Sequence, residues 1–534
     1  MTPLAFVNGP IFVEGGRRTG LAVGARGGRI VTIGPPADVL ADVGAGADIV
    51  DLEGRMLLPG FQDAHVHPGS SGLDSMRCSL DECESAEEVA AAIAGYAATR
   101  PPGDWIRGAG WTYTHYRRGC PSAQELDSIV GDRPAFLEVR DGHSAWASSE
   151  ALRLAGIGVN TPDPRGGRIE RLADGRPQGT LHEAAMHLVR AVIPEDTPDE
   201  REAGILEGQR YLLSLGVTAW QDASVEPGFH DAYLALAGRG ELHAQVRGAL
   251  RWDPDGGVEQ TEALVERRSQ GLGNYHPEAV KLMLDGVIEN YTASMLEPYI
   301  DESGRRTAAA GLDFIDPAAL ADHVRSLDAL GFQCHFHAIG DGAVRSALDA
   351  TAAARLANGD RDLRHTAAHI QVVDPSDIPR FAAVGLIPNA QPLWACMEEA
   401  MTVLTIPHIG EGRGRHQYPF GSLHRSGARL AMGSDWGVTT ANVMKQVHVA
   451  VHRSLPGGDP LLTEESIDLS TAMTAFTAGS AYVNHLDADR GTLAVGKVAD
   501  LVVLDHDPFE QPGTWDVAVD LTLVGGVVRY ERGR

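Results

Sequence analysis

Lysine is almost absent from this chain, whose 534 residues include only Lys281, Lys445 and Lys497. Arginine supplies the rest of the 45 basic side chains, and 72 acidic residues bring the formal net charge to −27. Such an acidic surface would repel nucleic-acid phosphates and anionic lipid headgroups. We therefore expect a small-molecule substrate and neither a nucleic-acid nor a membrane partner.

Cysteine is also scarce, and long apolar runs are missing. No apolar run approaches the ~20 residues of a membrane span, and the first residues lack the basic and apolar segments of a signal peptide. An odd number of cysteines without a C-x-x-C pair favours free thiols in a reducing cytoplasm. We expect a cytoplasmic protein and leave homo-oligomer formation open. The cysteines are Cys78, Cys83, Cys120, Cys334 and Cys396.

The two ends of the chain share a pattern of short strands. Since 534 residues exceed one ordinary domain, these ends predict a small domain beside a larger one. We expect a β-sandwich built from residues 1–55 and 488–534, and a catalytic domain of residues 56–487. Apolar runs of strand length are residues 4–7, 11–13 and 28–33, then 499–505, 521–524 and 526–530.

The middle of the chain alternates apolar runs with helix-like segments, such as residues 317–330, 341–356 and 374–384. This alternation predicts an α/β fold, a (β/α)₈ TIM-like barrel, with an open sheet as the alternative. Residues 70–210, approximately, break the pattern and read as an insertion that acts as a lid. The predicted strands are residues 56–61, 217–221, 245–250, 279–284, 332–337, 364–370, 386–391 and 428–432.

Histidines and one aspartate stand at the ends of four of these strands. His65 and His67 are two apart, so in a strand both imidazoles project to the same face. Chance alone gives roughly 0.8 such pairs among 21 histidines, so this motif is weak by itself. A second pair, His335 and His337, closes another strand, and His369 and Asp435 end two more.

These positions predict a metal site, because the chemistry of a barrel lies at the carboxyl ends of its strands. We rank His337 above His335 as a ligand because His337 directly precedes Ala-Ile-Gly-Asp341. His335 is then either a substitute ligand or a partner of one.

Seven segments resemble the amidohydrolase superfamily, in particular the amidohydrolase-3 branch that includes N-substituted formamide deformylases. The resemblance covers nearly the whole chain and implies a metal-bearing barrel with a β-sandwich made from both termini. The segments are Leu58-Pro-Gly-Phe-Gln-Asp-Ala-His-Val-His67, Asp141-Gly-His-Ser-Ala-Trp146, Val280-Lys-Leu-Met-Leu-Asp-Gly286, His335-Phe-His-Ala-Ile-Gly-Asp341, Arg364-His-Thr-Ala-Ala-His-Ile-Gln371, Gly433-Ser-Asp-Trp436 and Gly491–Leu504.

The resemblance also implies the ligands and their roles. Lys281 occupies the strand-four position where binuclear members carry a carboxylated lysine that bridges two metal ions. Asp435 would be both a ligand and the proton acceptor. One or two divalent ions are implied, and nitrogen and oxygen donors suit Zn²⁺. The implied ligands are His65, His67, Lys281, His337, His369 and Asp435.

We therefore expect a metal-dependent hydrolase that cleaves the amide-type C–N bond of a small molecule, such as an N-substituted formamide or acyl amine. Metal-activated water would attack, with Asp435 as general base and then general acid. The alternatives are a deaminase of a small heterocycle and a noncatalytic binding barrel. In the superfamily that the chain resembles, the first typically uses one metal and a glutamate near strand five, where this chain has His335-Phe-His337 and no such glutamate. The second requires broken ligands.

Substrate contacts are harder to predict from sequence. His143 is a candidate, although a packed structural histidine is equally compatible with its motif. Trp111 and Trp436 are further candidates, since an aromatic pocket would suit a neutral, apolar amide. The aromatic residues considered for this pocket are Trp111, Tyr113, Trp146, Trp220, Tyr291, Trp394 and Trp436.

Overall fold

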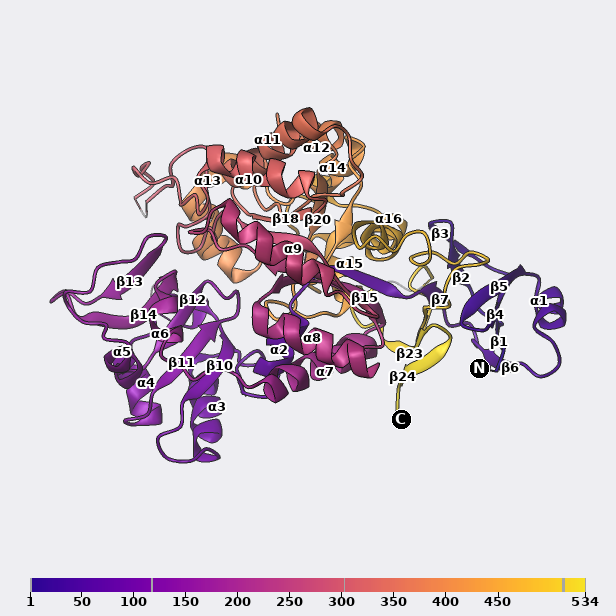
Figure 1. Cartoon of the computed structure of the whole chain (residues 1–534), viewed down its shortest axis with the longest axis horizontal. Helices are drawn as coiled ribbons and strands as arrows, with labels where there is room; N and C mark the ends of the chain where they lie inside the picture. Colours follow the sequence, from indigo (N-terminus) through magenta and orange to yellow (C-terminus); the bar gives the residue numbers. More distant parts are fainter. Residues whose placement is uncertain (1, 117–118, 302, 511–513, 534) are drawn as a thin grey trace.

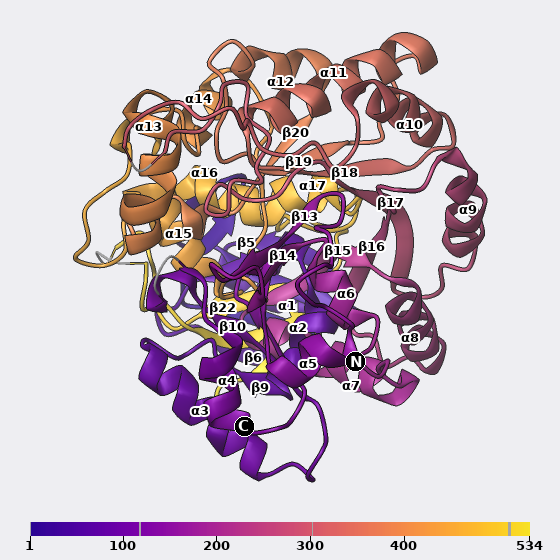
Figure 2. The ribbon, with the colours of Figure 1, turned by 90° about the vertical axis from the view of Figure 1, so that its left-hand side faces the viewer.

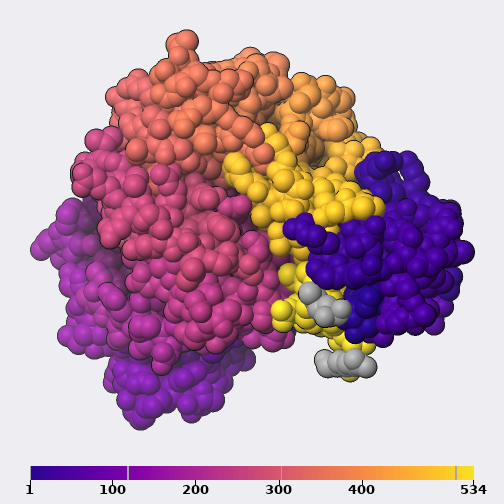
Figure 3. Space-filling view, turned by 45° about the vertical axis from the view of Figure 1, so that its right-hand side comes forward, coloured from indigo at the N-terminus to yellow at the C-terminus, as the bar shows by residue number. Residues whose placement is uncertain are grey.

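The computed structural model describes residues 2–116, 119–301, 303–510 and 514–533. It has three parts: a central barrel, a domain formed by both chain ends, and an insertion (Figure 1). The terminal domain and the insertion lie at opposite sides of the barrel, as the space-filling view also shows (Figure 3). No helix in the described ranges combines the length and apolar character needed to cross a bilayer.

Eight parallel strands form the barrel, which confirms the predicted fold class. The last strand adjoins the first, since the backbone N–H of Ser434 donates to Asp63 Oδ1 at 3.0 Å and that of Asp435 to the His65 carbonyl at 2.8 Å. In spatial order the strands are β8 (Phe61–Val66), β15 (Val217–Val225), β16 (Gln245–Arg251), β17 (Tyr275–Met283), β18 (Gln333–Ala338), β19 (Thr366–His369), β20 (Ile387–Ala390) and β21 (Ala431–Met432).

The first barrel strand differs from the prediction. The apolar run expected at residues 56–61 divides at Gly60: β7 (Leu57–Pro59) pairs with strands of the terminal domain, and β8 begins at Phe61. A Cβ atom on Gly60 would lie 2.2 Å from Thr218 Oγ1, so only glycine lets the chain pass so close to β15. The terminal domain therefore extends past residue 55. The sequence does not predict this boundary, because the apolar run continues unbroken from one sheet into the other.

Helices cover the outside of the barrel and begin at recognisable signals. Thr197 and Glu200 form a capping box at the start of α7, and Asp316 accepts two backbone N–H groups before Pro317 at the start of α10, as N-caps do. The surrounding helices are α2 (Pro68–Ser75), α7 (Pro198–Ser214), α8 (Pro227–Arg239), α9 (Thr261–Ser269), α10 (Pro317–Ala329), α11 (Asp341–Asn358), α12 (Ile378–Val384), α13 (Ile406–Gly414), α14 (Phe420–Arg425), α15 (Val443–His452), α16 (Leu469–Thr474) and α17 (Ser480–Val483).

Both chain ends build the terminal domain, as two sheets around one core. Phe6 and Val23 of one sheet and Leu57 and Leu501 of the other belong to the same buried cluster. One sheet contains β1 (Leu4–Val7), β4 (Ala22–Arg26), β5 (Arg29–Gly34) and β6 (Asp48–Asp51), flanked by α1 (Pro36–Val43). The other contains β2 (Ile11–Val13), β3 (Gly16–Arg18), β7, β22 (Leu501–Leu504), β23 (Val519–Val524) and β24 (Val527–Glu531).

The insertion has a six-stranded sheet and a hydrophobic core of its own, which includes Ile93, Leu126 and Trp146. It lies on one side of the barrel, in front of it in Figure 2. The insertion is shorter than the expected residues 70–210. Helices α2 and α7, at the two ends of that range, pack against each other beside the barrel and do not belong to the insertion. Its elements are β9 (Cys78–Ser79), α3 (Ala86–Ala98), β10 (Ile106–Trp111), α4 (Ala123–Val130), β11 (Ala135–Val139), β12 (Ser144–Ala147), α5 (Ser149–Leu154), β13 (Gly167–Arg171), β14 (Pro177–Glu183) and α6 (Met186–Arg190).

Candidate metal centre

A cavity of about 1980 Å³ lies between the barrel and the insertion, at the carboxyl ends of the barrel strands. The side chains predicted as metal ligands come from five of these strands or from the residues that follow them. All six line this one cavity: His65, His67, Lys281, His337, His369 and Asp435.

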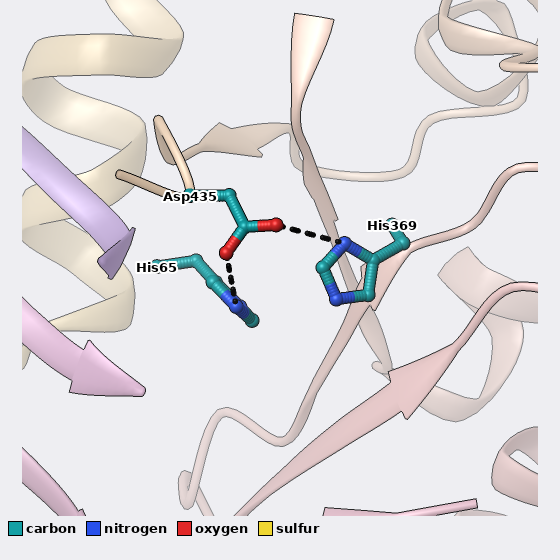
Figure 4. A group of neighbouring side chains, drawn as sticks. All are labelled: His65, His369 and Asp435. Carbon is teal, nitrogen blue, oxygen red and sulfur yellow. Dashed lines mark ion pairs between the residues drawn. The ribbon is translucent and has the colours of Figure 1, made fainter. Parts of the chain in front are cut away.

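Asp435 lies between histidines from two sides of the barrel (Figure 4). Its Oδ1 is 3.3 Å from Nε2 of both His65 and His67, and its Oδ2 is 3.8 Å from Nδ1 of His369. Donor atoms of His65, His369 and Asp435 all lie within 4.8 Å of one another. Nitrogen and carboxylate donors converging in this way fit a divalent metal ion such as zinc.

Burial keeps the imidazoles of His65 and His369 in the neutral form that binds metal. It lowers the pKa of His65 to about 3 and holds that of His369 well below its usual value. Burial alone would raise the pKa of Asp435, but His65, His67 and His369 outweigh this and hold it well below the normal range. Asp435 is therefore an ionised carboxylate among histidines, which suits a ligand.

Lys281 is a buried amine whose charge lacks a close partner. It is 2 % exposed, and Nζ makes neither a hydrogen bond nor an ion pair with the residues described. Burial lowers its pKa to about 7. In β17 it pairs in register with His335 of β18. An unpaired ammonium is costly to bury, so this position fits an amine that carries a further group.

Two of the candidate ligands have left-handed backbone conformations, with φ of 73° at His369 and 57° at Asp435. Neither residue is glycine, so each conformation is unfavourable and must be held by its surroundings. The N–H of His369 donates to Gln391 Oε1 at 2.7 Å, and that of Asp435 donates to the His65 carbonyl at 2.8 Å.

Two further side chains orient the histidines from behind. His335 Nε2 is 2.7 Å from His65 Nδ1, and His335 Nδ1 is 2.6 Å from Gln221 Oε1. His335 does not line the cavity, so it lies where a partner of a ligand is expected. Asp285 Oδ1 is 3.0 Å from His337 Nδ1. Both contacts leave the Nε2 atoms of His65 and His337 for a metal.

Asp63 and Asp285 were not predicted to act at this site. Asp63 Oδ1 accepts the N–H groups of His65 and Ser434 at 3.0 Å each, and Asp285 also accepts those of Ile339 and Gly340. Both aspartates fall within the segments that resemble the amidohydrolase superfamily, and this was the only sign in the sequence that they belong to the site. Their roles depend on contacts between strands that sequence spacing does not show.

His143 enters the cavity from the insertion. Its Nδ1 lies 3.0 Å from both carboxylate oxygens of Glu183, and its ring centroid is 5.4 Å from that of His337. Burial opposes a charge on His143, but Glu183 outweighs it and raises the pKa to about 9. Glu183 also accepts hydrogen bonds from Asn290 and Thr292 of the barrel.

Most of the aromatic residues expected to form a pocket do not line the cavity. Trp111 is completely buried, and its Nε1 donates to the Leu137 carbonyl in the core of the insertion. This corrects the expectation that Trp111 contacts substrate. Trp436 packs against Tyr211, with ring centroids 4.5 Å apart, and does not line the cavity. Of the seven aromatic residues considered, Tyr113 and Trp394 line it.

A second group of metal-type side chains lies in the insertion. His182 Nε2 is 3.1 Å from Glu170 Oε1 and 4.0 Å from Cys120 Sγ. Glu170 Oε1 also pairs with Arg168 at 2.8 Å, so a cation of the protein already balances the charge of this carboxylate. We interpret this group as a structural network.

Comparisons with known proteins agree with this geometry. The sequence pattern of the amidohydrolase family matches residues 48–530. Protein LONG AFTER FAR-RED 3 of Arabidopsis thaliana is 31% identical over 525 residues, which cover 95% of this chain and 87% of that protein. N-substituted formamide deformylase of Arthrobacter pascens is 29% identical, with 96% and 95% covered.

A solved structure of a metal-dependent hydrolase from Pyrococcus furiosus, described as uncharacterized, has the same fold. It aligns with a TM-score of 0.71 and 26% identity, covering 95% of this chain and 99% of that one. The barrel carries a cluster of histidines and an aspartate at the carboxyl ends of its strands, and the family pattern matches most of the chain. The chain therefore belongs to the amidohydrolase family of metal-dependent hydrolases.

Proposed function

We propose that this protein hydrolyses the amide-type C–N bond of a small molecule in the cytoplasm. The observation that carries the proposal is the position of Asp435, whose carboxylate lies within 4 Å of three histidines inside a large cavity. The named relative that acts on N-substituted formamides supports this bond type. A formamide or another acyl amine is the substrate we favour.

The metal would be held by His65, His67, His337, His369 and Asp435. Zn²⁺ fits this donor set, because imidazole nitrogen and carboxylate oxygen are its usual ligands alongside thiolate. When bound, a divalent ion of this kind supplies Lewis acidity toward a carbonyl oxygen and toward water. His335 and Asp285 would fix the ring orientation of His65 and His337.

We further propose that Lys281 is carboxylated and bridges two metal ions. The buried amine has no hydrogen-bond partner among the described residues, and its pKa of about 7 leaves much of it neutral near neutral pH. Only a neutral amine can add to carbon dioxide. The resulting carbamate would add a negative charge to the cluster that already holds the Asp435 carboxylate.

Asp435 would move the proton during hydrolysis. Its low pKa keeps the carboxylate ionised, so it can accept a proton from the attacking water and deliver it to the leaving nitrogen. The left-handed backbone at residue 435 is strained, and strain of this kind is common where geometry must be held for chemistry.

His143 would contact the substrate from the insertion. Glu183 holds Nδ1, which leaves Nε2 as a donor facing the cavity near His337. Because the insertion covers the cavity from this side, it would also exclude water around the bound amide.

The test is hydrolysis of a panel of N-formyl and N-acyl amines by the metal-loaded protein, compared with the Asp435→Asn variant. We expect wild-type turnover and a loss of at least about 1000-fold in kcat in the variant, with metal content largely retained. Turnover by the variant within about tenfold of wild type would show that Asp435 is not the base.

A further inference from the structure

Arg251 ends strand β16 beside the metal centre. It pairs in register with Lys281 of β17, and residues paired across neighbouring strands project to the same face of a sheet. Lys281 points into the barrel, so Arg251 points there too. Both side chains line the cavity.

Arg251 differs from most other arginines around this cavity. Eight arginines line it, and six of them form an ion pair with an aspartate or glutamate. Arg251 and Arg267 form none with the part of the chain that the structure describes. Arg267 lies on the outer helix α9, whereas Arg251 belongs to the barrel itself.

The surroundings of Arg251 leave most of its donors unused. Nη1 donates to Ser224 Oγ at 3.2 Å, although a guanidinium has five N–H donors. The carboxylates that attract it, Glu226 and Asp253, are exposed and do not pair with it. Burial lowers its pKa, but arginine remains charged. A half-buried cation with open donors is expected to have an anionic partner.

We propose that Arg251 binds an anionic group of the substrate, a carboxylate carried by the amide that is cleaved. The planar guanidinium matches a carboxylate with two parallel hydrogen bonds, and the Ser224 hydroxyl adjoins it. This inference rests on the proposed amide hydrolysis. It replaces the sequence-based expectation of a neutral, apolar substrate, since only two of the seven aromatic residues behind that expectation line the cavity.

Matched pairs of amides test the proposal. In one pair the carboxylate is on the amine half, as in N-acetyl-phenylalanine (both enantiomers) against N-acetyl-phenethylamine. In the other it is on the acyl half, as in N-benzylsuccinamate against N-benzylbutyramide. We expect wild type to prefer the carboxylate member of at least one pair by 10- to 100-fold in kcat/KM, on the order of a hydrogen-bonded charge.

Variants assign this preference to Arg251. Arg251→Met should abolish the preference for the carboxylate member, mainly by raising its KM, while kcat/KM for the neutral member changes little. Arg251→Lys should retain part of the preference. Arg267→Met is the matched control and should keep it. Equal losses for charged and neutral members in Arg251→Met would indicate a structural role and overturn the proposal. A wild-type preference for neither carboxylate would also overturn it, while amide hydrolysis stands.

Failure of the proposed hydrolysis is separable from failure of this inference. If the metal-loaded protein cleaves none of these amides, calorimetry measures their binding instead. Tighter binding of a carboxylate member than of its neutral analogue, lost in Arg251→Met and kept in Arg267→Met, would support the anion site. Equal binding of both members, or a preference unaffected by Arg251→Met, would refute it.

Discussion

His335 lies directly behind His65, with Nε2 of the first 2.7 Å from Nδ1 of the second. The contact fixes which nitrogen of His65 is left for a metal. Removing such a partner typically lowers metal affinity 10- to 100-fold. We therefore expect His335→Ala to weaken metal binding about 10- to 100-fold in a chelator competition. His424→Ala, at an exposed position of α14, is the control, and equal affinities in the two variants would contradict this role.

Lys281 should be needed for full metal loading. We expect Lys281→Ala to bind about one equivalent fewer than wild type, because a bridging ligand is lost. Reconstitution of metal-free wild type should be faster with added bicarbonate, and native mass should exceed the summed mass of the chain and its bound metal by that of one CO₂. Lys445→Ala is the control on the outer helix α15. Bicarbonate-independent loading together with an unmodified Lys281 would refute the carbamate.

Glu183 should act through His143. The Glu183→Gln variant keeps the size of the side chain but loses the charge that holds His143, so kcat/KM should fall at least about tenfold with metal content unchanged. The double variant with His143→Asn should be no worse than His143→Asn alone, because the two residues act as a unit. Glu170→Gln, another histidine partner in the insertion, should have little effect. Additive losses in the double variant would show that Glu183 and His143 act independently and would contradict this prediction.

Close packing of α2 against α7 offers a test of the fold. A Cβ on Gly72 would lie 2.0 Å from the Gly204 carbonyl oxygen and 2.8 Å from the Gly208 nitrogen. Backbone atoms cannot yield as a flexible side chain would, so we expect Gly72→Ala to destabilise by about 1–3 kcal/mol and to lower Tm. Gly95→Ala in α3 has no atom within 4 Å and should raise Tm slightly. A Tm for Gly72→Ala at or above wild type would contradict this packing.

Much of the barrel, and the gathering of the candidate ligands at one cavity, could be predicted from local pattern. The His65 and His67 pair, His337, His369 and Asp435 each follow an apolar run, and the ends of parallel strands meet at one face of a barrel. The same reasoning misplaced the first strand, because an apolar run that crosses from one sheet to another at Gly60 reads as one strand.

The rest of the site depends on contacts between segments far apart in the chain. Glu183 meets His143 only because the insertion folds β12 against β14 and docks on the loop after β17. Arg251 forms no ion pair with the described residues because Glu226 and Asp253, the carboxylates that attract it, are exposed and do not contact it. The aromatic residues of the sequence did not predict the cavity lining, since Trp111 and Trp220 are buried in separate hydrophobic cores.

Elemental analysis of the purified protein tests the central claim most directly. After expression with metal supplementation, followed by removal of free ions, we expect about one to two equivalents of tightly bound divalent metal per chain. A His65→Ala/Asp435→Ala variant of unchanged circular dichroism should lose most of it. Less than ~0.2 equivalents in wild type, where a complete ligand set should retain a metal, would contradict the account.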